Sequence, residues 1–97
     1  MNEIQRETYT RLHAYVHGQV HGVGFRYFVQ KNARALFVTG WVRNAPQGIV
    51  EVVAEGPHYI LERLLMFLQE GPRSATVTSL ETSWETPTRE FSDYKIR

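Results

Sequence analysis

The chain has 97 residues, enough for one domain with a core but too few for a second lobe or a large cofactor cradle. Its formal net charge of +1 gives no general attraction to nucleic acid or to membrane surfaces, so recognition of an anion must be local. The absence of cysteine excludes disulfides, thiolate nucleophiles and cysteine-ligated metals.

We expect the chain to have neither a signal peptide nor a membrane-spanning helix. Its first residues lack the apolar stretch and small-residue cleavage site of a signal peptide, and no run approaches the roughly 18 apolar residues of a membrane helix. We therefore expect a cytoplasmic monomer that binds neither membranes nor nucleic acid. We expect residues 1–97 to form one domain, with a mobile segment at residues 1–9.

The first half of the chain predicts a strand, a helix and two further strands. Apolar and polar residues alternate in "LHAYVHG", which predicts a strand over residues 10–19 with Leu12, Ala14 and Val16 facing the core. Apolar residues then recur at helical spacing and predict about three turns of helix from Phe25. This apolar arc comprises Phe25, Phe28, Val29, Ala33, Leu36 and Phe37. Two strands follow in "TGWVRNAPQGIVEVVAEG", joined by the turn "APQG".

The second half predicts another helix and two strands. Gly56 and Pro57 are expected as N-cap and first residue of the helix, and Gly71 with Pro72 as its end. Its buried stripe comprises Ile60, Leu61, Leu64, Leu65, Phe67 and Leu68. Strands are expected in "ATVTSLETSWE" and "FSDYKIR". The order βαββαβ plus a short final strand predicts an α+β fold, a ferredoxin-like α/β sandwich with both helices on one face of a mainly antiparallel sheet.

The segment "GQVHGVGFR", residues 18–26, joins the first strand to the first helix and contains three glycines and an arginine. A helix N-terminus offers N–H groups that have no intrahelical partner, and glycines let such a loop curl around a phosphate. Arg26 in the first helical turn costs about 0.3 to 1 kcal/mol at an exposed site, which a bound phosphate would offset. The alternative is a flexible turn whose arginine reaches water or a surface carboxylate.

Other phosphate-binding motifs do not fit this loop. The nucleotide P-loop pattern is absent, and Tyr27 stands where a dinucleotide fingerprint needs its third glycine. A cysteine-dependent phosphatase loop would need a cysteine six residues before Arg26, where the chain has Val20. The loop also lacks serine and threonine, so it supplies no hydroxyl nucleophile.

A second motif, "GWVRNAPQG", places Asn44 eighteen residues after Arg26. Together the two motifs resemble the signature pair of the acylphosphatase family, roughly GxVQGVxFR and G[WFY]VxNxxxGxV, and the resemblance extends over nearly the whole chain. It implies hydrolysis of the anhydride between a carboxylic and a phosphoric acid. It also implies a small acyl phosphate as substrate and a reaction that needs neither a metal nor an organic cofactor.

The resemblance further implies roles for particular residues. Arg26 would bind and neutralise the phosphoryl oxygens, and Asn44 would orient the attacking water while the substrate's phosphate accepts the proton. Backbone N–H groups would cradle the phosphate, and they belong to His21, Gly22, Val23, Gly24 and Phe25. His21 departs from the pattern, because the family usually has glutamine there. We expect a spectator histidine whose charge tunes binding rather than a phosphohistidine intermediate.

Two rival functions stay open on the sequence. A noncatalytic module that binds a phosphorylated ligand or a protein would keep the loop but have no use for Asn44. RNA binding on the open sheet face is suggested by "VGFRYFV" and disfavoured by the near-neutral charge.

The histidines do not suggest a metal site. His13 and His17 would share one face of a strand at about 13 Å between backbones, too far apart to hold one ion together. His58 is expected to be an exposed surface residue.

Overall fold

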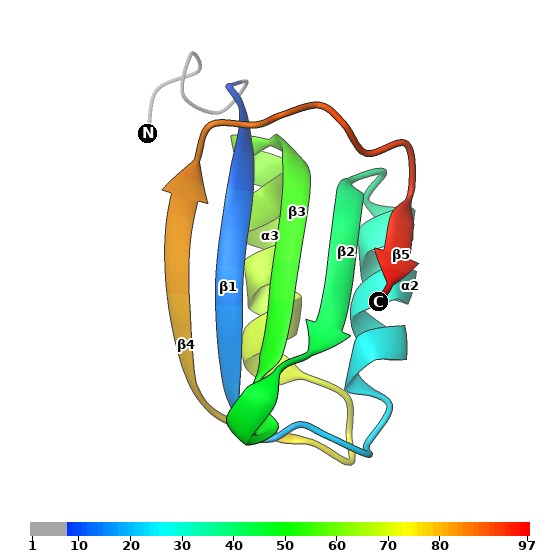
Figure 1. Cartoon of the computed structure of the whole chain (residues 1–97), viewed down its shortest axis with the longest axis vertical. Coiled ribbons are helices and arrows are strands. Elements are labelled where there is room, and N and C mark those ends of the chain that lie inside the picture. Colours follow the sequence, from blue (N-terminus) through cyan, green and yellow to red (C-terminus); the bar gives the residue numbers. More distant parts are fainter. Residues whose placement is uncertain (1–7) are drawn as a thin grey trace.

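The computed structural model describes residues 8–97 and confirms the predicted order of elements (Figure 1). Residues 1–7, most of the segment expected to be mobile, lie outside the described residues. The strands are β1 Tyr9–Gln19, β2 Thr39–Asn44, β3 Val50–Pro57, β4 Thr76–Glu85 and β5 Tyr94–Ile96. The helices are α2 Phe25–Ala35 and α3 His58–Glu70, and a short 3-10 turn, η1 Pro46–Gly48, joins β2 to β3.

The five strands form one sheet in the order β4-β1-β3-β2-β5. Strand β3 pairs antiparallel with both β1 and β2, β4 pairs antiparallel with β1, and the short β5 runs parallel to β2. Since β1 and β2 both run opposite to β3, they point the same way and end at the same end of the sheet, the lower end in Figure 1.

The core lies between the sheet and the two helices, which cover the rear face in Figure 1. The alternation on β1 is confirmed, since Leu12, Ala14 and Val16 are fully buried. The helices contribute Phe25, Val29, Ala33, Leu61, Leu64 and Leu68. Each large apolar side chain buried in this way stabilises the fold by about 1.5 to 3 kcal/mol. Within residues 8–97 no helix is long and apolar enough to cross a membrane.

The start of α3 differs from the sequence prediction by one residue. Strand β3 pairs with β1 as far as Pro57, so Gly56 lies inside the strand. Pro57 is therefore the N-cap rather than the first helical residue, and the helix begins at His58. Its end agrees with the prediction, because Gly71 terminates it with a φ of 70°.

His58 is not the exposed residue that the sequence suggested. Its ring packs against Trp84 of β4, with 4.2 Å between ring centroids, and its Nδ1 atom is buried 3.5 Å from an oxygen of Glu62. The edge strand β4 therefore covers the first turn of α3.

Phe37 was expected in the apolar arc of the first helix, and this prediction is wrong. Its side chain is 93% exposed and its φ is 60°. The N–H of Phe37 donates to the carbonyl of Arg34 and that of Val38 to the carbonyl of Ala33, each at 3.1 Å. This pair of bonds closes the helix in a Schellman motif, whose left-handed residue is usually glycine. The motif ends α2 and turns Phe37 outward.

We predict that Phe37→Gly raises the free energy of unfolding by about 0.5 to 1 kcal/mol. Glycine removes a left-handed strain of about 1 to 2 kcal/mol and loses part of that gain to its own backbone entropy. Urea unfolding measures the change, with Phe37→Ala as the control because alanine keeps the strain. If Phe37→Ala raised the free energy of unfolding by the same amount, the stabilisation would come from removal of the exposed ring and not from relief of strain.

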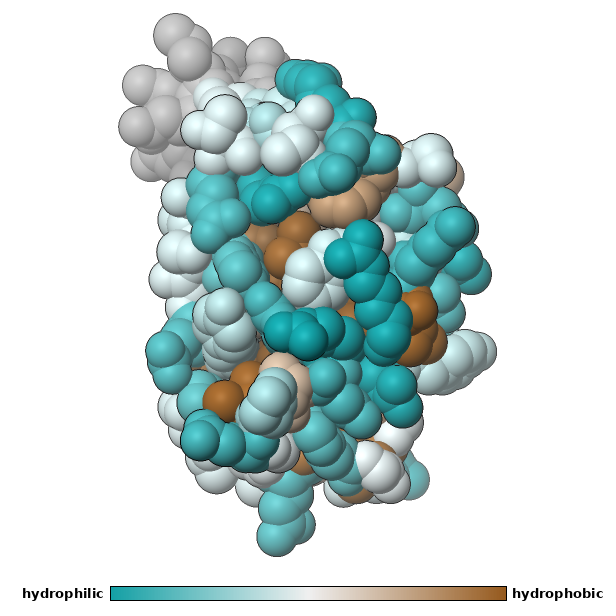
Figure 2. All heavy atoms as spheres, viewed as in Figure 1, coloured by the Kyte–Doolittle hydropathy of each residue, from teal (hydrophilic) through white to brown (hydrophobic). Residues whose placement is uncertain are grey.

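The open face of the sheet is largely hydrophilic (Figure 2) and holds a fully buried carboxylate, Glu55. Its oxygens accept hydrogen bonds from Arg11 Nε at 2.8 Å, from the Thr88 N–H at 2.9 Å and from the Arg89 N–H at 2.8 Å. Burial alone would raise the pKa of Glu55, but these bonds outweigh it and hold the pKa below its usual value. Glu55 thus ties the segment after β4 to the centre of the sheet.

Glu51, on the same strand, is held in a similar way. Its two oxygens lie 2.6 Å from Nε2 of His13 and 2.6 Å from Nε of Arg43. Burial opposes ionisation of Glu51, yet these two partners keep its pKa below the usual value. Sequence analysis missed both glutamates, although Glu51 stands directly opposite Arg43 and Glu55 opposite Arg11 in the strand register.

We predict that Glu55→Gln lowers the free energy of unfolding at pH 7 by about 2 to 3 kcal/mol, because a neutral amide cannot serve all three donors. Since the folded pKa lies below the unfolded one, the carboxylate's stabilisation is present above about pH 4.3 and is lost as the pH falls through the folded pKa. Urea unfolding between pH 7 and pH 2 should therefore show the deficit shrinking in acid. Glu70→Gln, at an exposed site, is the matched control, and a deficit that stays constant with pH would contradict the assignment.

Candidate active site

Two chain segments meet at the end of the sheet where β1 and β2 terminate (Figure 1). One is the loop of residues 20–24 between β1 and α2, and the other is Asn44 with the turn that follows it. Their side chains and backbone share a pocket of about 200 Å³. It is lined by Val20, Gly22, Gly24, Phe25, Arg26, Tyr27, Asn44 and Ile96. The structure therefore brings together Arg26 and Asn44, which the sequence placed eighteen residues apart.

The loop is anchored at both ends and curled between them. Val20, its first residue, and Phe25, which follows it, are each 1% exposed, so both ends are fixed in the core. Gly22 and Gly24 have φ values of 71° and 76°, a left-handed conformation that glycine adopts without steric cost. The hydroxyl of Ser74 donates to the carbonyl of Val23 at 2.9 Å. The alternative of a flexible turn does not fit these contacts.

The start of α2 offers donors to an external acceptor. The first intrahelical bond runs from the Phe28 N–H to the Gly24 carbonyl at 3.0 Å, so the N–H groups of the preceding turn have no partner within the helix. Gly24 is the N-cap and supplies no side chain to satisfy them. The first turn holds no acidic residue, so its positive dipole end is not neutralised locally. An anion would be favoured at this position.

Arg26 is a cation without a carboxylate partner among residues 8–97. By contrast, Arg11 and Arg34 are paired with Glu55 and Asp93 at 2.8 and 2.9 Å. Arg26 is exposed and lines the pocket together with Gly24 and Phe25 of the helix start. Its charge is available to a bound anion, and within residues 8–97 the alternative of pairing with a surface carboxylate is not observed.

Asn44 is the last residue of β2 and is exposed at the pocket. It stands opposite Val50 in the strand register, which fixes its backbone. The turn beyond it reverses through positive φ values of 65° at Gln47 and 77° at Gly48, as expected for the glycine but not for the glutamine. The N–H of Ala45 closes the turn by donating to the carbonyl of Ile49 at 2.7 Å.

Of the five loop residues whose N–H groups are expected to bind phosphate, three line the pocket. Gly22, Gly24 and Phe25 line it, whereas His21 and Val23 are not among the lining residues. Val23 packs against the core. The Nε2 atom of His21 lies 2.7 Å from the carbonyl oxygen of Ile49, on the turn after Asn44. A carbonyl only accepts, so this nitrogen carries a proton and donates.

Sequence reasoning missed three residues around this pocket. Tyr27 and Ile96 line it and are 66% and 39% exposed, so they form an apolar rim beside Arg26. Ile96 belongs to β5, whose parallel pairing with β2 has no signature in the sequence. Ser74 supports the loop from the segment before β4, and its serine in "GPRSATV" gives no hint of that contact.

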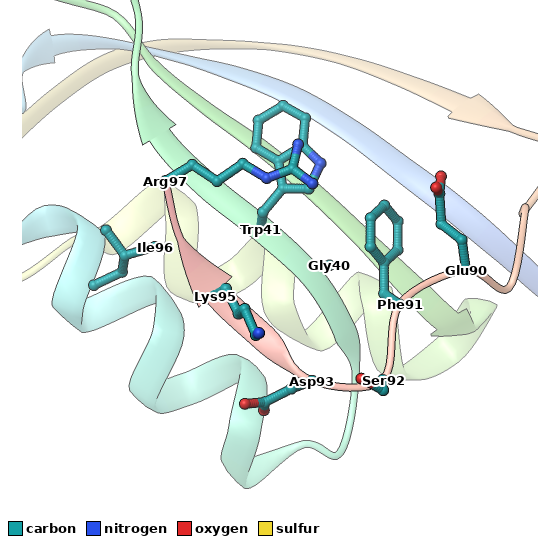
Figure 3. A pocket seen from close by; sticks show the side chains of 9 residues that line it. All are labelled: Gly40, Trp41, Glu90, Phe91, Ser92, Asp93, Lys95, Ile96 and Arg97. Carbon is teal, nitrogen blue, oxygen red and sulfur yellow. The ribbon is translucent and has the colours of Figure 1, made fainter.

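A separate hollow of about 250 Å³ lies on the open face beside β2 and β5 (Figure 3). The guanidinium of Arg97 lies over the ring of Trp41, 4.8 Å from its centroid, and the Arg97 N–H donates to the carbonyl of Val42 at 2.9 Å. The terminal arginine thus covers Trp41 and is not among the residues that line the pocket of Arg26.

The histidines of β1 are engaged with separate carboxylates. His13 lies 2.6 Å from Glu51 and His17 lies 2.7 Å from Glu81. Within residues 8–97 no group of three or more His, Cys, Asp or Glu side chains is placed to hold a metal ion.

Comparison with known proteins decides the family, because residues 12–96 match the acylphosphatase family model. The chain belongs to the acylphosphatase family. It is 43% identical over 94 residues to the acylphosphatase of Salinibacter ruber, covering 97% of this chain and 99% of that protein. It is 51% identical over 74 residues to the acylphosphatase of Thermus thermophilus, covering 76% and 84%.

The fold agrees with the same family. The crystal structure of acylphosphatase from Bacillus subtilis superimposes with a TM-score of 0.87 at 33% identity, covering 91% of this chain and 98% of that one. The protein is therefore an acylphosphatase, a hydrolase with a ferredoxin-like fold.

We predict that Gly22→Ala weakens binding of inorganic phosphate about threefold to tenfold. A Cβ at this position meets no atom within 4 Å, so the effect arises from a left-handed backbone strain of about 1 kcal/mol rather than from a clash. Calorimetric titration with phosphate measures it. Gly48→Ala is the matched control, with a φ of 77° and equally open space, and its phosphate affinity should stay within about twofold. Equal losses in both variants would show that the loop has no special role.

Proposed function

We propose that the protein hydrolyses the carboxyl-phosphate bond of acyl phosphates to a carboxylate and inorganic phosphate, without a metal or organic cofactor. The observation that carries this proposal is that one pocket is lined by Arg26, which has no carboxylate partner within residues 8–97, by the open N-terminus of α2 and by Asn44. A site that only binds an anion would need Arg26 and the N-terminus of α2. Asn44 adds a group that can hold a water molecule.

In this proposal the phosphoryl group binds at the helix start. The N–H groups of the curled loop and of the first turn donate to its oxygens, and the guanidinium of Arg26 adds charge-assisted bonds. These donors are held in place before the substrate arrives, because both ends of the loop are fixed in the core. Charge that develops on the phosphoryl oxygens therefore meets donors that need no rearrangement.

Asn44 is assigned to the attacking water. Its side-chain amide both accepts and donates hydrogen bonds, so it can orient a water molecule without removing its proton. The water oxygen forms a bond to phosphorus while the bond from phosphorus to the acyl oxygen breaks, and the carboxylate leaves with the bonding electron pair. The proton released by the water passes to the phosphate. Since the carboxylate is a good leaving group, positioning and charge stabilisation can carry the rate.

The exposed rim of the pocket supports tolerance toward the acyl half of the substrate. Tyr27 and Ile96 are the large side chains there, and neither carries a charge that would select one acyl group. The rim therefore provides no charge that would select among acyl phosphates with different acyl groups.

The two rival functions are less well supported. A noncatalytic phosphate-binding module would not require Asn44 beside the anion site. RNA binding would use the open face of the sheet, but the formal net charge of +1 gives the chain little general attraction to a polyanion.

We predict that Asn44→Ala lowers kcat about 100-fold or more while phosphate affinity stays within about threefold, because the variant loses the group that orients water and keeps the phosphate donors. The assay is hydrolysis of an aryl acyl phosphate in excess chelator, paired with calorimetric titration of phosphate. Full turnover in Asn44→Ala would contradict its role. An unmodified protein that binds phosphate without turnover would support the module.

The variant Arg26→Ala is expected to lose both phosphate affinity and turnover. Removing the charged hydrogen bonds should weaken phosphate binding about tenfold or more and reduce turnover with it. Arg63→Ala, at an exposed position of α3, is the matched control for the loss of one positive charge. Equal behaviour of the two variants would mean that only net charge matters.

A further inference from the structure

The phosphate loop and the turn after Asn44 meet at one backbone oxygen. The carbonyl of Ile49 accepts a hydrogen bond from the Ala45 N–H at 2.7 Å and another from Nε2 of His21 at 2.7 Å. Ala45 directly follows Asn44 in the chain. We propose that His21 is a positioning residue, which holds Asn44 at a fixed distance from the phosphate loop through the carbonyl of Ile49. This inference rests on the proposed function.

The turn that follows Asn44 has no buried side chain of its own. None of the three residues of η1 is buried, so no side chain there fixes the turn in the core. Gln47 occupies a left-handed conformation with a φ of 65°, which strains the backbone of a residue other than glycine. The position of the turn therefore depends strongly on the hydrogen bonds that converge on Ile49.

The loop that carries His21 is, by contrast, fixed independently. Val20 and Phe25 bury its two ends, and Ser74 holds the carbonyl of Val23 at 2.9 Å. The imidazole thus reaches from an anchored element to a less anchored one, across 28 positions of sequence. A carbonyl oxygen has two lone pairs, so it can accept both bonds at once.

In the proposed reaction, the hydrogen bond from His21 to the Ile49 carbonyl affects the rate of hydrolysis. The donors to phosphate lie on the loop, and the group that orients water lies at the end of β2, just before the turn. The bridge therefore adds to the strand pairing in holding the distance between water and phosphorus. A displacement of about 1 Å at such a site can cost on the order of 100-fold in rate. Loss of the bridge should therefore lower turnover and leave phosphate binding nearly unchanged, because the loop keeps its other anchors.

The test compares His21→Ala with His21→Gln, whose side-chain amide also offers an N–H donor toward the Ile49 carbonyl. For an aryl acyl phosphate, kcat of His21→Ala should fall about fivefold to thirtyfold. Its KM and its dissociation constant for inorganic phosphate should stay within about twofold, and His21→Gln should recover kcat to within about threefold of the unmodified protein. His17→Ala is the matched control, since it removes another hydrogen-bonded histidine of the same chain segment away from the pocket.

A spectroscopic readout separates this role from general destabilisation. In the ¹H–¹⁵N spectrum, the Ala45 backbone amide and the Asn44 side-chain amide should shift in His21→Ala and return toward their original positions in His21→Gln. Unchanged kcat in His21→Ala, failure of glutamine to recover kcat, or unmoved signals of both residues would each overturn the proposal. If the unmodified protein lacks turnover, the proposed function itself fails, and the spectra alone still decide whether His21 holds Asn44.

Discussion

Strand β3 pairs antiparallel with a neighbour on each side, and this arrangement determines where the site can form. Because β1 and β2 both run opposite to β3, they leave the sheet at the same end, separated by two strand spacings of about 4.8 Å each. The loop begins where β1 ends, and Asn44 lies where β2 ends. A slip of one residue in either register would exchange core and surface side chains, so burial of the core also holds the site in alignment.

The site is built from groups that the fold leaves without internal partners. Gly24 caps α2 without a side chain that could compete with a ligand, and Arg26 carries a charge that no carboxylate among residues 8–97 neutralises. Some other charges are paired closely, as the contacts of Glu55 with Arg11 demonstrate. What distinguishes Arg26 from the other arginines without a carboxylate partner is its place at the pocket, beside the uncapped start of α2.

Local patterns in the sequence predicted most of the fold, and backbone hydrogen bonds explain what they missed. The alternation around Leu12 is a local signal that burial of one sheet face confirms. Phe37 fitted the helical spacing, but spacing alone does not register the Schellman motif that ends the helix before it. Arg26 and Asn44 could be identified because the two motifs that contain them resemble the signature pair of the acylphosphatase family. The Ile49 carbonyl that His21 contacts carries no side-chain identity, so no pattern of residue types could reveal it.

The position of β1 in the sheet also has consequences for the order in which the molecule can assemble. Residues 9–19 form the first strand of the chain, yet one of their neighbours is residues 76–85. The helices can form from neighbouring residues, whereas this pairing must close a loop of most of the chain before it gains any hydrogen bond. During synthesis β1 stays without this neighbour until residues 76–85 have been made. Strand β1, which lies in the interior of the folded sheet, is thus the strand that is exposed for longest in the nascent chain. During that time its edge can pair with other chains.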